Sequence, residues 1–314
     1  MKSRLIVVVA AAIAIVSVVT VVIVRLRAEA AMPVAHATLA PRPDSYLGVY
    51  EPGSPPAYRE ISAFGQAAGR RPNLAGYYSG WGQPFEGAFA RTLHQHGITP
   101  VVQVDPTGAS IAAIAAGTYD SYLRSYADSV RGFGHAVVIG FGHEMNAGWY
   151  SWGYRHVPAA TFVAAWRHVV TVFRQQGADN VTWLWTVQGD VPGTGAVRSW
   201  WPGRQYVTWV GIDGYYYRPS DTFAAVFGST ISQVRDFTRL PVLLSETAVG
   251  PRAGQPVKIA DLFRGMATAR ALGLVWFDIP QHDGIYHQDW RIESSPAAQR
   301  AFRLAVLTEL RPAS

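Results

Sequence analysis

The sequence predicts an α/β fold, a single (β/α)8 TIM barrel, from three observations. Short β-branched apolar runs alternate with longer helical stretches from Tyr46 onward. Eight such runs fit in about 265 residues, and a (β/α)8 barrel needs roughly 250. Apolar residues make up 49% of the chain and charged residues 15%, which favours a large core over disorder. A doubly wound sheet is the alternative, but no glycine-rich phosphate loop follows any run.

The eight predicted strands are short and evenly distributed. In chain order they are YLGVY (46–50), NLAGYY (73–78), ITPVVQV (98–104), HAVVIGF (135–141), VTWLWTV (181–187), YVTWVGID (206–213), PVLLSE (241–246) and GLVWFDI (273–279). Helical patterns fill the intervals, most clearly at 118–134, 158–177 and 258–273. Several of these end on glycine, the usual C-cap residue, and Pro158 stands where a helix start tolerates proline.

The first 45 residues differ in character from the rest. Leu5–Val24 contains no charge and is flanked by basic residues, and its twenty residues match a hydrocarbon core of ~30 Å. We predict a signal anchor or transmembrane segment at 1–27, an Ala/Pro-rich linker at 28–45 and the barrel at 46–314. The barrel is then expected outside the cell, held at the cell membrane. Two small-x-small sites after the segment leave cleavage and secretion open.

Charge and cysteine content exclude several kinds of protein. The net charge is +6, but residues 1–45 carry five basic and two acidic residues and account for half of it. The remaining basic residues are scattered, so nucleic acid is not an expected partner. The chain has no cysteine, which rules out disulfides, thiolate metal sites and a cysteine nucleophile. We expect a monomer.

Carboxylates follow several of the predicted strands, where barrel enzymes place their catalytic groups. They are Asp105, Glu144, Asp213, Glu246 and Asp278. Strands four and seven lie on opposite sides of a barrel mouth, so Glu144 and Glu246 can face each other. Cleavage of a glycosidic bond needs two such carboxylates. Aromatic residues that can stack on sugars also follow the strands, among them Trp81, Trp149, Trp152, Tyr215 and Trp276.

Three motifs resemble those of glycoside hydrolase family 26, which includes β-mannanases, mixed-linkage β-glucanases and β-1,3-xylanases. GHEMNAGWYSWG (142–153) is similar to the acid/base signature of the family, YVTWVGIDGYY (206–216) to its sixth-strand motif and LLSETAVG (243–250) to its nucleophile strand. The motifs occur in the family's order and spacing, and the similarity covers essentially all of residues 46–310.

The resemblance implies roles for eight residues. Glu144 corresponds to the general acid/base and Glu246 to the nucleophile of a retaining mechanism. The others are expected to bind the substrate or hold the carboxylates: His143 and Asn146 beside the cleavage point, Trp149 at an aromatic subsite beyond it, Asp213 and Tyr215 next to the nucleophile, and Trp276 as the platform under the sugar being cleaved.

The predicted function is that of a retaining endo-β-glycanase acting on polysaccharide, with β-1,4-mannan first and mixed-linkage β-1,3-1,4-glucan close behind. Two departures from the family pattern leave mannan specificity open. Thr208 replaces the usual aspartate, and Phe277 stands where mannanases often carry a polar or basic residue. The alternative is a catalytically inactive polysaccharide-binding barrel at the cell surface, which would need neither carboxylate.

A metal site and a cofactor are not expected. His143-Glu144 begins like a zinc-binding helix motif, but that motif requires a second histidine at position 147, which is alanine. The pairs His94/His96 and His282/His287 are better explained as surface or core residues than as ligands.

Overall fold

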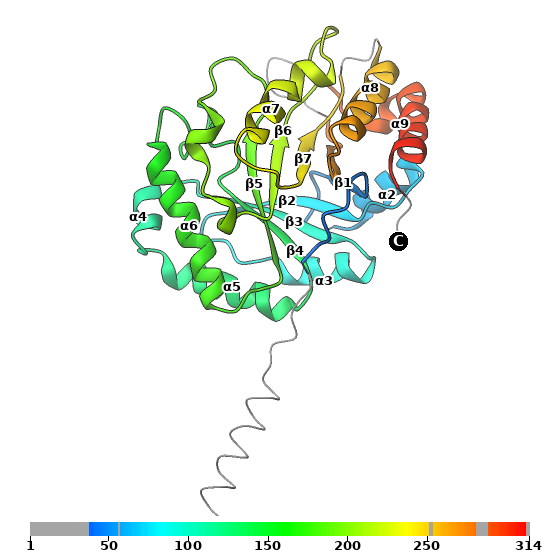
Figure 1. The fold of residues 1–314 in the computed structure, drawn as a ribbon. Coiled ribbons are helices and arrows are strands. Elements are labelled where there is room, and N and C mark those ends of the chain that lie inside the picture. The colour runs from blue at the N-terminus through cyan, green and yellow to red at the C-terminus, as the bar shows by residue number, and fades with distance from the viewer. Residues whose placement is uncertain (1–37, 56, 251–253, 281–287, 312–314) are drawn as a thin grey trace, which may run out of the picture. The chain divides into compact units, whose positions relative to one another are not determined.

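The computed structural model describes residues 38–55, 57–250, 254–280 and 288–311. Eight parallel strands form a closed barrel in sequence order, with β8 paired to β1 (Figure 1). The strands are β1 Tyr46–Tyr50, β2 Leu74–Gly80, β3 Thr99–Asp105, β4 Val137–Phe141, β5 Val181–Gln188, β6 Trp209–Asp213, β7 Val242–Thr247 and β8 Gly273–Phe277. The predicted eight-stranded parallel barrel is confirmed, and each predicted run overlaps one of its strands, although the described residues between β5 and β6 form no α-helix.

Helices surround the strands (Figure 1). Among the described residues, the α-helices are α2 Arg59–Ala68, α3 Gly87–Gln95, α4 Ile111–Ala115, α5 Asp120–Phe133, α6 Ala159–Gln175, α7 Ser229–Arg235, α8 Gln255–Thr268 and α9 Pro296–Glu309. Short 3-10 turns occur at η1 Val197–Trp200, η2 Arg204–Tyr206 and η4 Ile292–Ser294, and a π-turn, η3 Ala224–Gly228, leads into α7.

Glycine ends α5 at the predicted Gly134 and also ends α2. The predicted end of the helix at Gly273 is wrong, because α8 ends at Thr268 and Gly273 begins β8. Gly69 and Gly134 follow α2 and α5 with φ of 72° and 76°, the left-handed conformation that glycine adopts without a steric penalty. Their N–H groups donate to the carbonyl oxygens of Gln66 and Arg131. These caps turn the chain sharply back toward the next strand, so each strand begins at the same end of the barrel.

The apolar core has two layers. The larger one packs between the strands and the helices and includes Trp166 and Trp185, both fully buried. The smaller one lies inside the barrel and combines residues from all eight strands, such as Leu74, Leu184 and Trp209. Polar residues replace this inner layer toward the carboxyl ends of the strands, where the predicted site lies.

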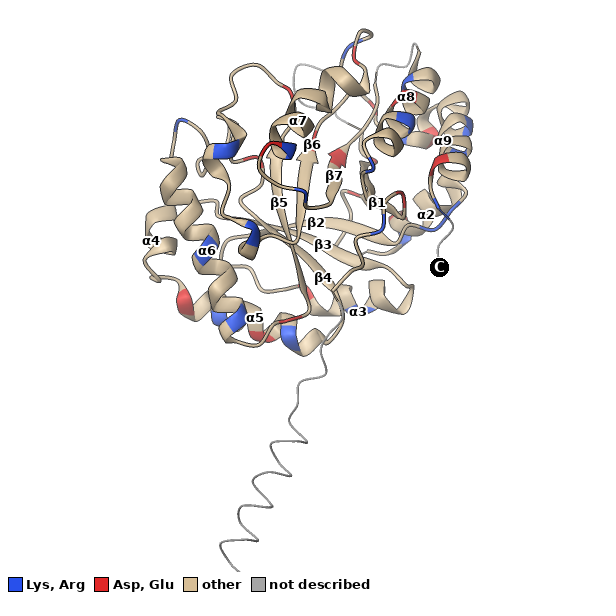
Figure 2. Ribbon diagram, viewed as in Figure 1, with Lys and Arg blue, Asp and Glu red and all other residues tan. Residues whose placement is uncertain are grey.

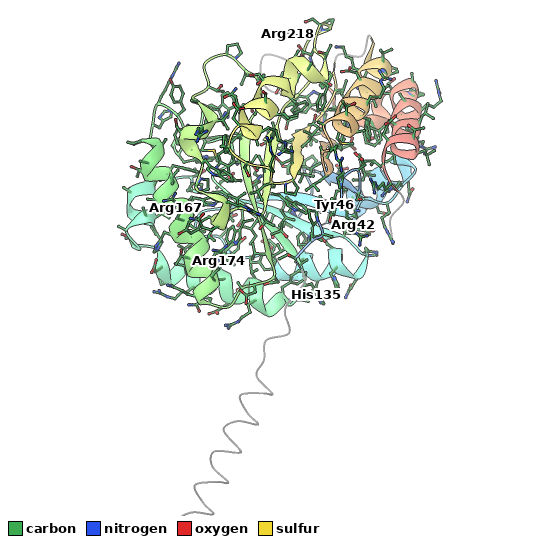
Figure 3. The ribbon with its side chains drawn as sticks, in the orientation of Figure 1. Arg42, Tyr46, His135, Arg167, Arg174 and Arg218 are labelled. Atoms are coloured by element: carbon green, nitrogen blue, oxygen red, sulfur yellow. The ribbon has the colours of Figure 1, made fainter. Side chains whose placement is uncertain are left out.

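The segment just before the first strand belongs to the barrel. The backbone N–H of Leu39 donates to Thr182 Oγ1 of β5 (3.3 Å), and the leucine side chain packs against the inner core layer. The hydroxyl of Tyr46 donates to the carbonyl of Ala40 (2.6 Å), and Figure 3 labels this tyrosine beside Arg42. Part of the predicted linker is therefore packed, because an apolar residue is available to cover the amino-terminal end of the barrel.

The described residues contain no helix long and apolar enough to cross a membrane. The predicted anchor, Leu5–Val24, lies outside the described residues.

Candidate active site

Three acidic side chains converge at the carboxyl ends of the strands. Glu144 follows β4, Asp213 ends β6 and Glu246 lies in β7, and one oxygen from each lies within 4.8 Å of the other two. All three are buried. Figure 2 shows acidic colour at the tip of β7, whereas the basic residues lie on helices and loops around the barrel. The predicted pair thus meets at the mouth, with Asp213 as a third member.

A tight turn after β4 presents Glu144 to the mouth. Gly142 and Glu144 both have positive φ, 56° and 54°. A Cβ on Gly142 would lie 2.9 Å from the Phe162 ring, so glycine is required there for space as well as for conformation. Glu144 has no such freedom and is held by hydrogen bonds from its N–H to Thr186 O (3.0 Å) and from Ala147 N–H to its own carbonyl (2.8 Å). Backbone strain of this kind is concentrated at functional sites.

An irregularity in β7 directs Glu246 inward. Ile212 of β6 pairs with Leu244, but the next residue, Asp213, pairs with Glu246, so Ser245 is passed over. Such a bulge changes which residues face the interior of a sheet. Ser245 donates to Asp213 Oδ1 (2.5 Å), and both neighbours, Ser245 and Glu246, reach polar partners at the mouth.

The surroundings of Glu144 favour its protonated form. Burial raises the pKa of this carboxyl group, the charge of Glu246 raises it further, and the result is about 7. The positive charge of His143 and a hydrogen bond from the Trp149 indole N–H to Oε2 (2.7 Å) act in the opposite direction. The Trp149 side chain is 54% exposed. Glu144 can therefore both donate and accept a proton near neutral pH.

Two tyrosine hydroxyls hold Glu246. Tyr215 donates to Oε2 (2.7 Å) and Tyr78, from β2, donates to Oε1. Burial raises the pKa of both tyrosines well above the usual value, and the charge of Glu246 contributes in the same direction. Both phenols therefore stay protonated and act as fixed donors to the carboxylate.

The surroundings of Asp213 favour its neutral form. Burial raises the pKa of its carboxyl group well above the usual value, and the charges of Glu246 and Glu144 raise it further. A hydrogen bond from the protonated acid to Glu246 acts in the same direction. Asp213 thus lies beside the predicted nucleophile, as the resemblance implies.

His143 supplies positive charge next to the acids. Burial lowers the pKa of its ring, but the hydrogen bond with Asp105 and the charge of that residue outweigh burial and raise the pKa to about 9. The two ring nitrogens then donate to Asp105 Oδ1 (2.9 Å) and to the Tyr150 hydroxyl (3.0 Å). A fully buried imidazolium partly offsets the repulsion between the carboxylates at the mouth.

Asn146 is engaged with the backbone. Its Nδ2 donates to the carbonyl of Gln188 (3.0 Å) and its Oδ1 accepts the N–H of Gln188 (2.8 Å). The side chain is 1% exposed. In the structure, Asn146 joins the β4 turn to the end of β5, and a contact with the sugar stays a prediction.

Trp276 lies away from the mouth. Its ring is fully buried against Phe302 of α9, with centroids 5.0 Å apart, and its N–H donates to Trp290 O (2.9 Å). Phe277 faces the mouth instead and stacks on Tyr50 at 4.3 Å. Adjacent strand residues point to opposite faces, so the two cannot both line the site. Phe277, and not Trp276, therefore presents its ring at the mouth, next to Tyr50 and Tyr215.

The sequence reasoning missed three aromatic residues of the site: Tyr50, Tyr78 and Tyr150. Tyr50 and Tyr78 pack edge to face, with ring centroids 5.3 Å apart. Tyr78 also packs against Phe277 and donates its hydroxyl to Glu246. The signal that could have found Tyr78 is strand alternation. Tyr77 packs outward on Phe89 of α3, so its successor must face the interior.

The acid cluster is also the one group of residues in the described part of the chain with the spacing of a metal site. Three carboxylate oxygens within 4.8 Å of one another could contact a cation. Glu144 and Glu246 already accept hydrogen bonds from Trp149, Tyr78 and Tyr215. The arrangement can move a proton and present a carboxylate nucleophile without further ligands.

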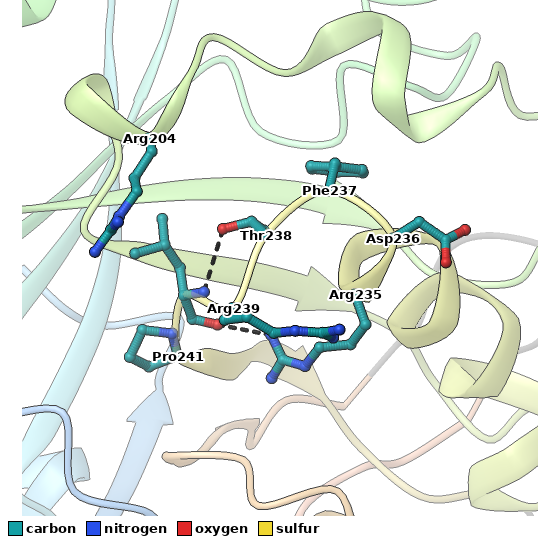
Figure 4. A pocket seen from close by; sticks show the side chains of 8 residues that line it. Arg204, Arg235, Asp236, Phe237, Thr238, Arg239 and Pro241 are labelled. Carbon is teal, nitrogen blue, oxygen red and sulfur yellow. Dashed lines mark hydrogen bonds between the residues drawn. The ribbon is translucent and has the colours of Figure 1, made fainter.

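A separate basic cavity lies at the opposite end of the barrel (Figure 4). It has a volume of about 590 Å³ and is lined by residues that precede β6 and β7, among them Arg204, Arg235 and Arg239. Arg235 donates to the carbonyl of Leu240 (2.7 Å). None of the three acids at the mouth contributes to this cavity, so it has no part in their chemistry.

The fold and the site define the class of protein: a (β/α)8 barrel with a pair of glutamic acids at the mouth, the arrangement of a glycoside hydrolase. A model of glycosyl hydrolase family 26 matches residues 122–290, more than half of the chain. The chain belongs to this family.

Two relatives of known name match parts of the chain. Endoglucanase H of Acetivibrio thermocellus is 28% identical over 271 residues, which are 81% of this chain and 29% of that protein. The β-1,3-xylanase TXYA of a Vibrio species is 27% identical over 123 residues, 38% of this chain and 25% of that protein. The chain thus spans less than a third of the length of either relative.

Solved structures share the fold. The Bacillus subtilis mannanase man26 superposes with a TM-score of 0.65 over 86% of both chains, at 14% identity. A β-mannanase from a symbiotic protist of the termite Reticulitermes speratus gives 0.59, covering 85% of this chain and 88% of that chain at 19% identity. At such identities the likeness concerns the fold alone.

Proposed function

We propose that the protein is a retaining endo-β-glycanase with Glu144 as general acid/base and Glu246 as nucleophile. The observation that carries this proposal is a close pair of buried glutamates in different surroundings. Their oxygens lie within 4.8 Å of each other, and the pKa of Glu144 is raised to about 7. Retaining enzymes hold the two carboxyl groups about 5–5.5 Å apart, whereas inverting enzymes need roughly 6.5–9.5 Å for an intervening water.

In the first step, Glu246 attacks the anomeric carbon while Glu144 gives its proton to the glycosidic oxygen. The carbon–oxygen bond breaks, the leaving sugar departs with a hydroxyl group, and the other sugar stays on Glu246 as an ester. The hydroxyls of Tyr78 and Tyr215 support this step because they keep the attacking carboxylate oriented.

In the second step, Glu144 takes a proton from water, and the oxygen of that water displaces Glu246 from the anomeric carbon. The sugar keeps its configuration. The ester no longer carries the charge of Glu246, which had raised the pKa of Glu144. The pKa of Glu144 therefore falls after the first step, and the same residue becomes a base at unchanged pH.

Alanine at each glutamate tests the assignment. Glu246→Ala should abolish turnover on every substrate because no ester can form. Glu144→Ala should lose about 10²–10⁴-fold or more on polysaccharide. It should still form the ester from an aryl glycoside whose leaving group needs no proton, and added azide should speed its release. The matched control is Glu60→Ala, a partly exposed glutamate in helix α2 that belongs to no contact of the acid cluster.

If azide restored activity in the Glu246 variant and not in the Glu144 variant, the two assigned roles would have to be exchanged. An inverted first product, followed by NMR of the anomeric protons, would exclude the retaining mechanism. Binding of polysaccharide without release of reducing sugar by the wild type would favour the inactive binding barrel.

For the substrate, we propose mixed-linkage β-glucan ahead of β-1,4-mannan, the reverse of the order that the sequence favours. The relative that aligns with 81% of the chain is named as an endoglucanase, and the mannanases resemble the chain at 14–19% identity. Phe277 at the mouth also provides an apolar surface where a polar contact to a mannose hydroxyl would be needed. Incubation with mannan, lichenan or β-1,3-xylan, followed by measurement of the product sizes, decides which of the three polysaccharides is the substrate.

For location, we propose that residues 5–24 hold the protein at the cell membrane with the barrel outside, as a monomer. The support is the uncharged length of that segment. Protease treatment of intact cells should remove the barrel, and light scattering in detergent should give a single chain. Soluble protein in the medium, cut after Ala30 or Ala37, would favour secretion.

A further inference from the structure

A second cavity adjoins the two glutamates on the β5–β6 side of the mouth. Its volume is about 500 Å³, within the range of ~300–1,000 Å³ typical of ligand sites. Trp149 and Tyr215 line it, and these side chains donate hydrogen bonds to the two glutamates. Gln188, the last residue of β5, and Arg218, labelled on the loop beyond β6 in Figure 3, also line it.

Most polar groups of the wall are already engaged. The carboxylate of Asp190 accepts the N–H of Ser229 (2.7 Å) and the hydroxyl of Thr230 (2.6 Å). Asp221 accepts the N–H of Arg218 (2.7 Å). These contacts order the loops and leave few groups to recognise a ligand.

The side-chain amide of Gln188 is different. The residue is only 7% exposed, and no hydrogen bond within the described residues involves its side chain. Asn146 bonds only its backbone N–H and carbonyl. The amide lies in the cavity wall and its oxygen and nitrogen stay accessible there, so both are free to bond a ligand that displaces water from the cavity. The cavity is the space in which such a ligand fits.

The position of the cavity indicates which part of a substrate it receives. The acid/base protonates the leaving oxygen, and the half-exposed indole bonded to Glu144 forms one wall of the cavity. The other side of the mouth is occupied by the aromatic cluster of Tyr50, Tyr78 and Phe277, which faces Glu246. The sugar attacked by Glu246 belongs on the aromatic side and the leaving sugar belongs in the cavity.

We propose that Gln188 determines specificity on the leaving side by hydrogen bonding a hydroxyl group of a neutral sugar there, with the indole of Trp149 as its platform. The inference rests on the proposed function. Because a retaining enzyme returns the ester to an acceptor in the same place, Gln188 also recognises the sugar acceptor in transglycosylation.

The test compares two leaving groups on the same enzyme. Gln188→Ala should lower kcat/KM on the preferred polysaccharide by about five- to thirtyfold, the loss expected for one or two uncompensated hydrogen bonds. It should leave kcat/KM on an aryl glycoside within about twofold, because a nitrophenyl group offers no hydroxyl to the amide. The share of transglycosylation products at high substrate should also fall. Gln188→Asn should recover part of each loss.

The matched control is Gln233→Ala, at an exposed glutamine on α7 outside the cavity. This variant should keep the wild-type kcat/KM on both substrates. Equal losses on polysaccharide and aryl glycoside at unchanged thermal stability would overturn the inference, as would no loss on either. Wild-type protein inactive on all substrates would instead overturn the proposed function.

Discussion

At Glu144, the charge of His143 and a hydrogen bond from Trp149 oppose two stronger influences that raise the pKa of the carboxyl group. Burial and the charge of Glu246 raise the pKa to about 7, while the indole N–H of Trp149 stabilises the carboxylate. Since the first chemical step requires the acid form, activity should decline as the pH rises through about 7. The indole is therefore one of the groups that set the upper end of the active pH range.

Trp149→Phe should move the alkaline limb of kcat/KM to higher pH. The variant keeps a ring but removes the N–H, so the carboxylate loses support and the pKa of Glu144 rises. A shift on the order of one pH unit is expected, because a hydrogen bond to a charged group contributes about 1.5–3 kcal/mol and one pKa unit corresponds to about 1.4 kcal/mol. Because the indole is exposed, the lower end of that energy range is expected.

Trp201→Phe is the control, since that indole packs on Trp185, in the layer between strands and helices. A limb that moves to lower pH in the Trp149 variant, or stays in place, would contradict this account.

Asn146→Ala should reduce stability more than substrate affinity. Both ends of the amide bond the backbone of Gln188 in a buried position. Leaving these backbone groups unpaired should cost about 1–3 kcal/mol in the free energy of unfolding, measured with urea. A large rise in KM with unchanged stability would instead restore the sugar contact that the sequence motif predicts.

At the scale of the element, the bulge in β7 depends on a glycine, Gly211, in the neighbouring strand β6. A Cβ on Gly211 of β6 would lie 2.4 Å from Thr186 Oγ1 and 2.5 Å from Ser245 Oγ. Ser245 holds Asp213 beneath the nucleophile. The glycine therefore provides the room in which the polar layer under the acids forms.

Gly211→Ala should displace Ser245 and lower both stability and kcat. Overpacking of this kind costs about 1–3 kcal/mol, and the loss of kcat should exceed any change in KM because the reacting groups move. Thermal unfolding and steady-state kinetics measure the two effects. Gly132→Ala is the control, at a helical glycine whose added Cβ would meet no atom within 4 Å. Wild-type values in the Gly211 variant would exclude the crowding argument.

Strand alternation explains which site residues the sequence could predict. Glu144, Asp213, Tyr215 and Trp149 follow strands or carry recognisable motifs, and the structure brings them together. Within β8, however, Val275 packs inside the barrel, so Phe277 shares its face and Trp276 does not. The inward turn of Glu246 depends on the bulge, which depends on the neighbouring strand and leaves no local pattern in the sequence.

At the scale of the whole molecule, the barrel was predictable because it repeats. Most units carry an apolar run followed by a helix, and several helices end on glycine. The eight runs fit one architecture even though, among the described residues, only the 3-10 turns η1 and η2 join β5 to β6. The segment before β1 was not predictable as part of the fold. Ala/Pro-rich composition indicates a linker, whereas the packing of Leu39 depends on an opening that exists only once the barrel closes.

The stability of the barrel should fall as the pH rises from about 4.5 to 8. Burial raises the pKa of Glu51 to about 8, with Glu293 adding to the effect, and Asp278 beside it is also raised. A group with a raised folded pKa contributes its full stability below its unfolded pKa and loses it as the pH passes the folded value. The protonated state of Glu51 therefore stabilises the fold near pH 5 and is lost toward pH 8.

Glu51→Gln should flatten this dependence. The amide cannot ionise and its oxygen still accepts a hydrogen bond from Asp278. The free energy of unfolding by urea should therefore differ less between pH 5 and pH 8 than in the wild type, where the change from this group is on the order of a few kcal/mol. Asp128→Asn is the control, because that side chain is 47% exposed on α5 and contributes to the pKa of neither Glu51 nor Asp278, so the pH dependence should stay as in the wild type. A wild type that gains stability over this range would contradict the prediction.

The contact of Leu39 with the inner layer sets the boundary of the independently folding unit. A chain shortened to begin at Tyr46 would keep all eight strands but lose the side chain that covers the amino-terminal end of the barrel interior, together with the hydrogen bonds to Thr182 and from Tyr46. Solvent would then reach apolar residues that the intact segment keeps dry. Truncated versions for expression should therefore retain residues from 38 onward, although every catalytic group lies at the other end of the barrel.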